Sequence, residues 1–100
     1  MTNLHIALHD GFRNDTVVIT VNGREVYRRT DVTTNLAISR ADASEVAVEE
    51  GEVRVEVEVP TRNLRAAITL DATQKPYLAV EITEQGSLAL SPSATPFRYM

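Results

Sequence analysis

An alternating run of valines constrains the fold of this 100-residue chain more than any other feature. Valine occupies every second position from Val53 to Val59, and charged residues fill the positions between. Successive side chains of a β-strand point to opposite faces, so this order separates a buried valine face from a solvent-facing charged face. A helix would scatter the same valines around its axis. The run therefore predicts a half-buried strand, which Pro60 ends because proline cannot donate to a strand ladder.

The dipeptide Asn22-Gly23 predicts a β-hairpin. It lies between residues 16–21, which are rich in β-branched side chains, and residues 24–29, which include Val26 and Tyr27. Asparagine and glycine readily adopt the two positive φ angles of a type I′ turn, which suits the twist of paired strands. We expect the flanking segments to pair in an antiparallel ladder.

Shorter alternating segments continue this pattern along the chain. Apolar residues alternate at 64–70 and 77–83, and the opening residues 4–8 suit a strand face better than a helical stripe. A short strand is expected at 88–90, with weaker ones at 36–39 and 45–48. Short turns separate the segments and no helical stretch intervenes, which favours antiparallel pairing.

These strands predict an all-β fold, namely an antiparallel two-sheet sandwich of about eight strands. We expect residues 1–90 to form this β-sandwich domain. Residues 91–100 contain two prolines among small polar residues, which interrupts the alternation. They predict an extended C-terminal tail.

Composition excludes several classes of function. With 43% hydrophobic and 24% charged residues the chain is typical of globular domains. Ten basic residues against 14 acidic ones, for a net charge of −4, argue against nucleic acid as a partner. The absence of cysteine excludes disulfides, thiolate metal sites and cysteine nucleophiles. No signal segment and no apolar run of membrane-spanning length is visible, so we expect no membrane span and a cytoplasmic location.

Few residues suggest catalysis or metal binding. His5 and His9 would share a helical face but would lie about 13 Å apart on a strand, too far for one metal ion. The loop from Asp10 to Asp15 offers oxygen ligands for calcium but lacks the EF-hand spacing, and its residues equally favour a turn. No nucleophile-elbow, P-loop or dinucleotide-binding glycine pattern occurs. We therefore expect no enzymatic activity and no cofactor.

Two groups of residues are candidates for contact with partners. Arg24, Arg28 and Arg29, with Arg40, form a basic concentration, and these arginines could pair with carboxylates of an adjacent strand or contact an anionic partner. The tail ends in Phe97, Arg98 and Tyr99, and aromatic and arginine side chains are enriched at the anchors of protein interfaces. The aromatic residues could instead fold back as an edge strand or cap the end of the sandwich.

Three segments carry a family resemblance. The hairpin Val-Asn-Gly-Arg-Glu-Val at 21–26 resembles that of small PEGA-like domains, and residues 50–57 and 77–82 are similar to later strands of those domains. The resemblance covers residues 16–83. It implies an immunoglobulin-like or transthyretin-like sandwich that serves as an accessory, adhesive or scaffold module, and it carries over no catalytic residue.

The sequence favours a non-catalytic protein-interaction or assembly domain, as a subunit of a homo-oligomer or of a larger complex. The alternative is a carbohydrate- or small-ligand-binding module. Such a module would need exposed aromatic residues on one sheet face, and the chain has no tryptophan and only three tyrosines. We therefore expect a protein partner or self-association.

Overall fold

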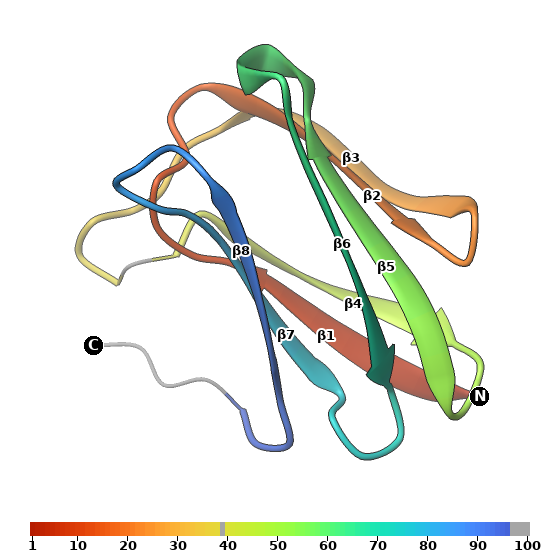
Figure 1. Ribbon diagram of the computed structural model, residues 1–100. Helices are drawn as coiled ribbons and strands as arrows, with labels where there is room; N and C mark the ends of the chain where they lie inside the picture. Colours follow the sequence, from red (N-terminus) through yellow and green to blue (C-terminus); the bar gives the residue numbers. More distant parts are fainter. Residues whose placement is uncertain (39, 97–100) are drawn as a thin grey trace.

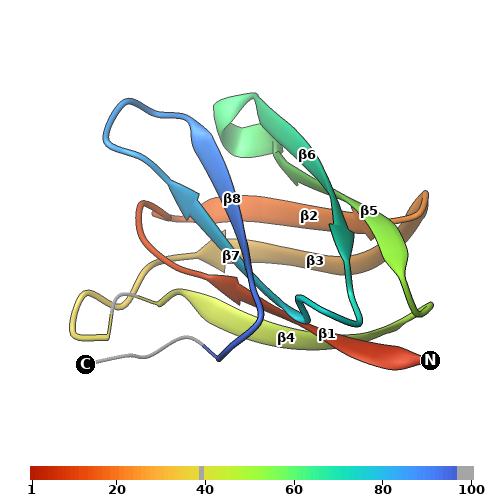
Figure 2. The same cartoon turned by 60° about the horizontal axis from the view of Figure 1, so that its bottom comes forward.

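The computed structural model describes residues 1–38 and 40–96. These residues contain eight strands, which form two four-stranded sheets. The sheets face each other as a β-sandwich (Figures 1 and 2). The β1 sheet has the strand order β4 (Asp42–Val48), β1 (Thr2–Leu8), β7 (Tyr77–Ile82) and β8 (Leu88–Ser93). The β2 sheet has the order β3 (Arg24–Val32), β2 (Asp15–Val21), β5 (Glu52–Val59) and β6 (Leu64–Asp71). The predicted all-β sandwich is confirmed.

The core lies between the two sheets and contains the alternating residues. The four valines of β5 from Val53 to Val59 are at most 1% exposed. On β1, Leu4, Ile6 and Leu8 are equally buried, which confirms that this opening segment is a strand. Burial of a side chain of this size stabilises a fold by about 1.5–3 kcal/mol. The alternation therefore accounts for the strands and for which of their faces is buried.

The Asn22-Gly23 hairpin is also confirmed. Asn22 has a φ of 49° and Gly23 a φ of 81°, and β2 and β3 pair in antiparallel on either side of them. The Oδ1 atom of Asn22 also accepts a hydrogen bond of 2.9 Å from the backbone N–H of Arg54 on β5. The turn is thereby attached to the centre of its sheet.

One pair of strands departs from the antiparallel prediction. β1 and β7 pair in parallel, from His5 opposite Tyr77 to Leu8 opposite Val80, so the purely antiparallel prediction is wrong for the β1 sheet. Short turns fix the direction of strands that follow each other in the chain. They do not constrain β1 and β7, which five strands separate in sequence.

Two boundaries also differ from expectation. Residues 36–38 form a turn rather than the expected strand, because a bridge between Asn35 and Arg40 closes this loop and Asn35 Oδ1 accepts a hydrogen bond from the N–H of Ala37. β8 continues to Ser93, so it includes the first three residues of the segment expected to be a tail. Pro92 lies opposite Leu78 and has no N–H to donate, which the sheet tolerates because β8 is an edge strand.

Candidate functional site

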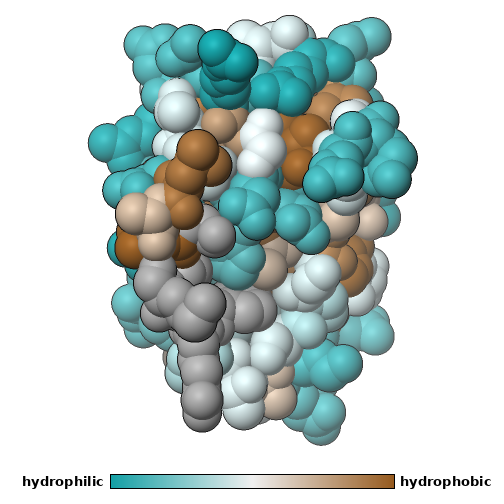
Figure 3. Space-filling view, turned by 90° about the vertical axis from the view of Figure 1, so that its left-hand side faces the viewer, coloured by the Kyte–Doolittle hydropathy of each residue, from teal (hydrophilic) through white to brown (hydrophobic). Residues whose placement is uncertain are grey.

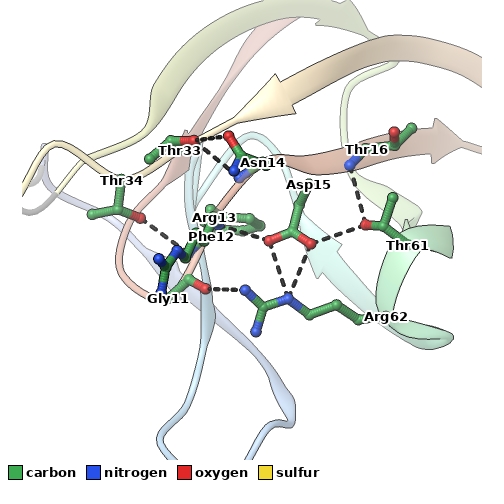
Figure 4. A network of polar contacts seen from close by, with 10 residues as sticks. All are labelled: Gly11, Phe12, Arg13, Asn14, Asp15, Thr16, Thr33, Thr34, Thr61 and Arg62. Atoms are coloured by element: carbon green, nitrogen blue, oxygen red, sulfur yellow. Dashed lines mark hydrogen bonds and ion pairs between the residues drawn. The ribbon is translucent and has the colours of Figure 1, made fainter.

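The carboxylate of Asp15, at the start of β2, is the most deeply buried charged group that the structure describes, at 2% exposure. Its Oδ1 accepts hydrogen bonds from the Thr61 hydroxyl at 2.9 Å and from Arg62 Nε at 3.0 Å. Its Oδ2 accepts from the Arg13 backbone N–H at 2.8 Å and from Arg62 Nε at 3.1 Å. Figure 4 shows these donors converging on the carboxylate.

A short 3₁₀ helix, η1 (Pro60–Arg62), positions two of the donors. Proline suits the first position of a helix, and Asn63 ends η1 in the left-handed region with a φ of 56°. From this turn the Arg62 guanidinium also donates to the Gly11 carbonyl at 3.0 Å. η1 therefore ties the end of β5 to the loop between β1 and β2.

The Asp15 site is suited to holding structure rather than to proton transfer. Burial disfavours the charged carboxylate, but hydrogen bonds from Arg62, the Arg13 N–H and Thr61 outweigh it and hold the pKa of Asp15 below its usual value. Three donors engage the two oxygens: the Thr61 hydroxyl binds Oδ1, the Arg13 N–H binds Oδ2, and the single Nε–H of Arg62 is shared between both. Of the oxygens considered above as calcium ligands, those of Asp15 are thus engaged by protein donors. Residues 1–38 and 40–96 contain no group of three or more side chains that could hold a metal ion.

A second polar cluster joins the two sheets along one side of the sandwich. The Tyr27 hydroxyl on β3 donates to Asp42 Oδ2 on β4 at 2.6 Å, and Arg29 Nη1 donates to the same oxygen at 2.7 Å. Burial, with the Asp42 carboxylate, raises the pKa of the Tyr27 phenol. Burial opposes ionisation of Asp42, but the hydrogen bonds from Tyr27 and Arg29 outweigh it and lower the pKa of the carboxyl. This cluster links edge strand β3 to edge strand β4.

The three arginines predicted to contact an anionic partner do not converge on one site. Arg29 belongs to the cluster with Asp42, and Arg28 pairs with Glu25 at 2.7 Å. Arg24 has no ion-pair partner within the described residues and lines a shallow hollow of about 220 Å³ that Glu49 also lines. Among these three arginines, only Arg24 therefore lacks an ion-pair partner within the described residues, and the carboxylate of Glu49 lines the same hollow.

The histidines lie on or near the outer face of the β1 sheet. Because β1 is a strand, the helical spacing that would bring His5 and His9 to one metal ion does not apply. The His5 ring stacks on Tyr77 at 4.9 Å between centroids, and its Nδ1 lies 3.8 Å from Oε2 of Glu45. These residues line a groove of about 350 Å³ with a mainly apolar wall that includes Ala43. Burial lowers the pKa of His9.

The side of the sandwich formed by β6 and β8 differs from the side formed by β3 and β4. β8 carries no charged residue, and β6 carries charge only at Arg65 and Asp71, near its two ends. Leu64, Ile68, Leu88 and Leu90 pack against the core from this side and are only partly buried. This surface could not be predicted from the sequence, because alternation shows which residues face inwards but not which strands lie at an edge.

The predicted interface residues Phe97, Arg98 and Tyr99 lie outside the described residues. On the side of the molecule that bears the loop 33–41, brown apolar atoms interrupt a mainly hydrophilic surface (Figures 1 and 3). Leu36 of this loop is 87% exposed. A single exposed leucine is normal on a protein surface and does not define a site.

Comparison with known proteins adds no family to this geometry. No family model matches the chain, and no curated protein or solved structure matches it. Within the described residues, no helix has the length and apolar character needed to cross a bilayer. A functional assignment therefore depends on the surfaces described above.

Proposed function

We propose that this chain is a non-catalytic interaction module that binds a protein partner by accepting an extended strand along β6. The observation that carries the proposal is the contrast between the two sides of the sandwich. The Tyr27–Asp42–Arg29 cluster bridges β3 and β4, whereas β6 is an edge strand whose central residues 66–70 carry no charge. Long, uncharged edge strands offer unpaired backbone groups to another chain.

The direction of the β6 backbone groups supports strand addition. The Ala72 N–H donates to the Gly51 carbonyl at 2.9 Å, towards β5. Because this direction alternates along an antiparallel strand, Ile68 also points its N–H and carbonyl towards β5. Ala67 and Thr69 then point theirs away from the sheet. An incoming strand would meet a regular row of donors and acceptors.

The arrangement of strands supports the transthyretin-like type over the immunoglobulin-like type. In an immunoglobulin-like sandwich the first strand pairs with the second. Here β1 pairs with β4 and β7, while β2 lies in the other sheet. This arrangement supports our proposal of a transthyretin-like sandwich with the accessory or scaffold role that the family resemblance implies.

The test uses a strand probe whose sequence is unrelated to β6. The probe is a capped octapeptide, Lys-Thr-Val-Thr-Val-Thr-Val-Lys, titrated into the ¹⁵N-labelled chain. We expect amide resonances of Ala67 and Thr69 to shift in a saturable manner, with small changes at the central strand β2. Ala67→Pro removes one outward N–H without removing a bond to β5, and it should abolish these shifts.

A proline elsewhere provides the matched control. Glu84 occupies the second position of an exposed turn that the Gly86 N–H closes by donating to the Thr83 carbonyl at 2.8 Å. This position accepts proline, so Glu84→Pro should bind the probe as the unmodified chain does. The proposal is wrong if β6 resonances do not respond, or if Ala67→Pro leaves the response unchanged.

A second candidate function, binding of a small ligand or carbohydrate, rests on the groove of about 350 Å³ beside Tyr77. An apolar wall next to a stacked ring pair and the Glu45 carboxylate resembles the mixed lining of small-molecule sites. Titration with a glycan panel, followed at the resonances of His5 and Ala43, tests it. Saturable shifts that Ala43→Trp abolishes by filling the groove would support this function, and no response to any glycan would exclude carbohydrate.

A further inference from the structure

The outer face of the β2 sheet carries an uncompensated negative charge at one end of β6. Glu52, at the start of β5, lies directly opposite Asp71, at the end of β6. Neither carboxylate has an ion-pair partner among the residues described. Like charges opposite each other destabilise a strand pair. A cation brought to Asp71 would relieve this repulsion.

The Asp71 carboxylate can accept such a cation without losing its present contacts. Its Oδ1 accepts hydrogen bonds from the N–H groups of Thr73 at 2.9 Å and Gln74 at 3.2 Å, which hold the turn after β6. Within the described residues, no hydrogen bond reaches its Oδ2. A cation could therefore pair with Oδ2 while the turn stays as it is.

The two arginines on this face already have carboxylate partners. Arg54 Nε lies 3.4 Å from Oε1 of Glu56, and Arg65 Nη2 lies 3.5 Å from Oε2 of Glu58. A strand added along β6 would therefore meet an unpaired negative charge at the Asp71 end. At the other end it would meet a positive charge that is already paired.

Backbone geometry places one residue of an added strand beside Asp71. Like Ala67 and Thr69, Asp71 points its N–H and carbonyl away from β5, so it can pair with an incoming residue. Side chains of directly opposite residues share one face of a sheet. The residue opposite Asp71 would therefore project onto the outer face, beside the two carboxylates. In an antiparallel strand this residue comes first, and the residue opposite Arg65 comes last.

The other face of an added strand would meet apolar side chains. Ile68 of β6 and Leu88 and Leu90 of β8 pack against the core from this side and are only partly buried. Side chains alternate along a strand, so every second residue of the added strand, beginning with its second, would point towards them. Apolar residues at these positions would remove the three side chains further from water.

We propose that the partner of β6 is a strand of another protein that runs antiparallel to β6 and carries lysine or arginine opposite Asp71. Apolar residues follow at every second position, beginning with the next one. This inference rests on the strand-addition function proposed above and specifies the chemistry of the partner. The basic side chain fixes the direction of the strand, because the opposite direction would bring it against Arg65.

Two capped heptapeptides of identical composition test the direction and the charge. They are Lys-Val-Thr-Val-Thr-Val-Gln and its reverse, Gln-Val-Thr-Val-Thr-Val-Lys. Only the first brings its lysine to Asp71 in an antiparallel strand. Both carry the same net charge, so general attraction to the acidic chain affects them equally. In ¹⁵N titrations followed at Ala67 and Thr69, we expect the first to bind about fivefold more tightly.

A substitution at Asp71 connects this preference to its carboxylate. Asp71→Asn keeps the Oδ1 acceptor of the turn and removes the charge, so the preference should fall to about twofold. Glu84→Gln is the matched control, because it removes one exposed carboxylate in the turn between β7 and β8. This variant should keep the preference of the unmodified chain. The amide spectra recorded in the titrations also show that each variant is folded.

The proposed partner chemistry is overturned if the first heptapeptide binds no more tightly than the second, or if Asp71→Asn leaves the preference unchanged. Saturable shifts of β6 resonances with the unrelated octapeptide would then still support strand addition. If neither the heptapeptides nor the octapeptide shift these resonances, both proposals are wrong.

Discussion

Nε of Arg62 lies 3.0 Å from Oδ1 of Asp15, across 47 positions of sequence, and so joins the two ends of the chain segment that contains β2 to β5. The arginine is 35% exposed and the aspartate 3% by side chain, so solvent reaches the cation more than the anion. The pair holds the β1–β2 loop against η1, and Nη2 of Arg62 also donates a hydrogen bond to the Gly11 carbonyl in that loop.

We expect Asp15→Asn to destabilise the fold by about 2 kcal/mol. The amide has one acceptor oxygen in place of two, and its NH₂ group would face the N–H donors of Arg62 or Arg13. Urea denaturation monitored by circular dichroism measures the change. Glu45→Gln, an exposed carboxylate outside this network, is the control and should change stability by about 0.5 kcal/mol or less. Equal losses in both variants would contradict the role of Asp15.

The stability of the chain should fall in acid. The folded-state pKa of Asp15 lies below its ordinary value of 3.8, so the carboxylate contributes stability above that value. This contribution is lost as the pH falls through the folded-state pKa, because the unfolded chain takes up the proton first. The lowered pKa of Asp42 acts in the same direction. Urea midpoints between about pH 6 and pH 2.5 should fall less steeply for Asp15→Asn; parallel curves would show that Asp15 does not contribute.

Gly11→Ala should be more damaging than an alanine at any other glycine. A Cβ on Gly11 would lie 2.1 Å from the Ile82 carbonyl oxygen, and its φ of +92° disfavours side chains. Gly86 has a φ of +82° but nothing within 4 Å of an added Cβ, which makes Gly86→Ala the matched control. We expect about 1 kcal/mol for the control and at least about 3 kcal/mol for Gly11→Ala from thermal or urea unfolding. Similar costs would show that the loop can move away from Ile82.

Substitution of two leucines compares the stability contribution of the core with that of the surface. Leu4 is fully buried and Leu36 is 87% exposed. Leu4→Ala should cost about 2–5 kcal/mol because it leaves a cavity between the sheets. Leu36→Ala should change stability by about 0.5 kcal/mol or less. A large loss at Leu36 would indicate that the loop 33–41 is covered in solution, for example in an assembled state.

Tyr27→Phe tests the link between β3 and β4. Removing the hydroxyl breaks the 2.6 Å hydrogen bond to Asp42 and leaves the ring in place. We expect a loss of about 1 kcal/mol. In the background Asp42→Ala, the same substitution should cost much less, and this double-mutant cycle isolates the contact. Additive losses would contradict direct coupling.

Some of the candidate surfaces could be anticipated and others could not. The sequence identified Arg24, Arg28 and Arg29 as the basic concentration, but pairing of two of them with Glu25 and Asp42 depends on positions in three dimensions. For Asp15 the sequence indicates a turn residue or a calcium ligand. The Arg13 N–H that donates to it belongs to the same loop, but the side-chain donors Thr61 and Arg62 come from η1, which no local pattern connects to Asp15.

Local chemistry determined the strands, their buried faces and the Asn22-Gly23 turn. Alternation and turn conformation are properties of neighbouring residues, so they can be read in order along the chain. Tertiary structure alone decided the parallel pairing of β1 with β7, the contact between Asp15 and Arg62, and the position of β6 at an edge. The physical reason is that each depends on which distant segments share a sheet, and the packing of the whole core makes that choice.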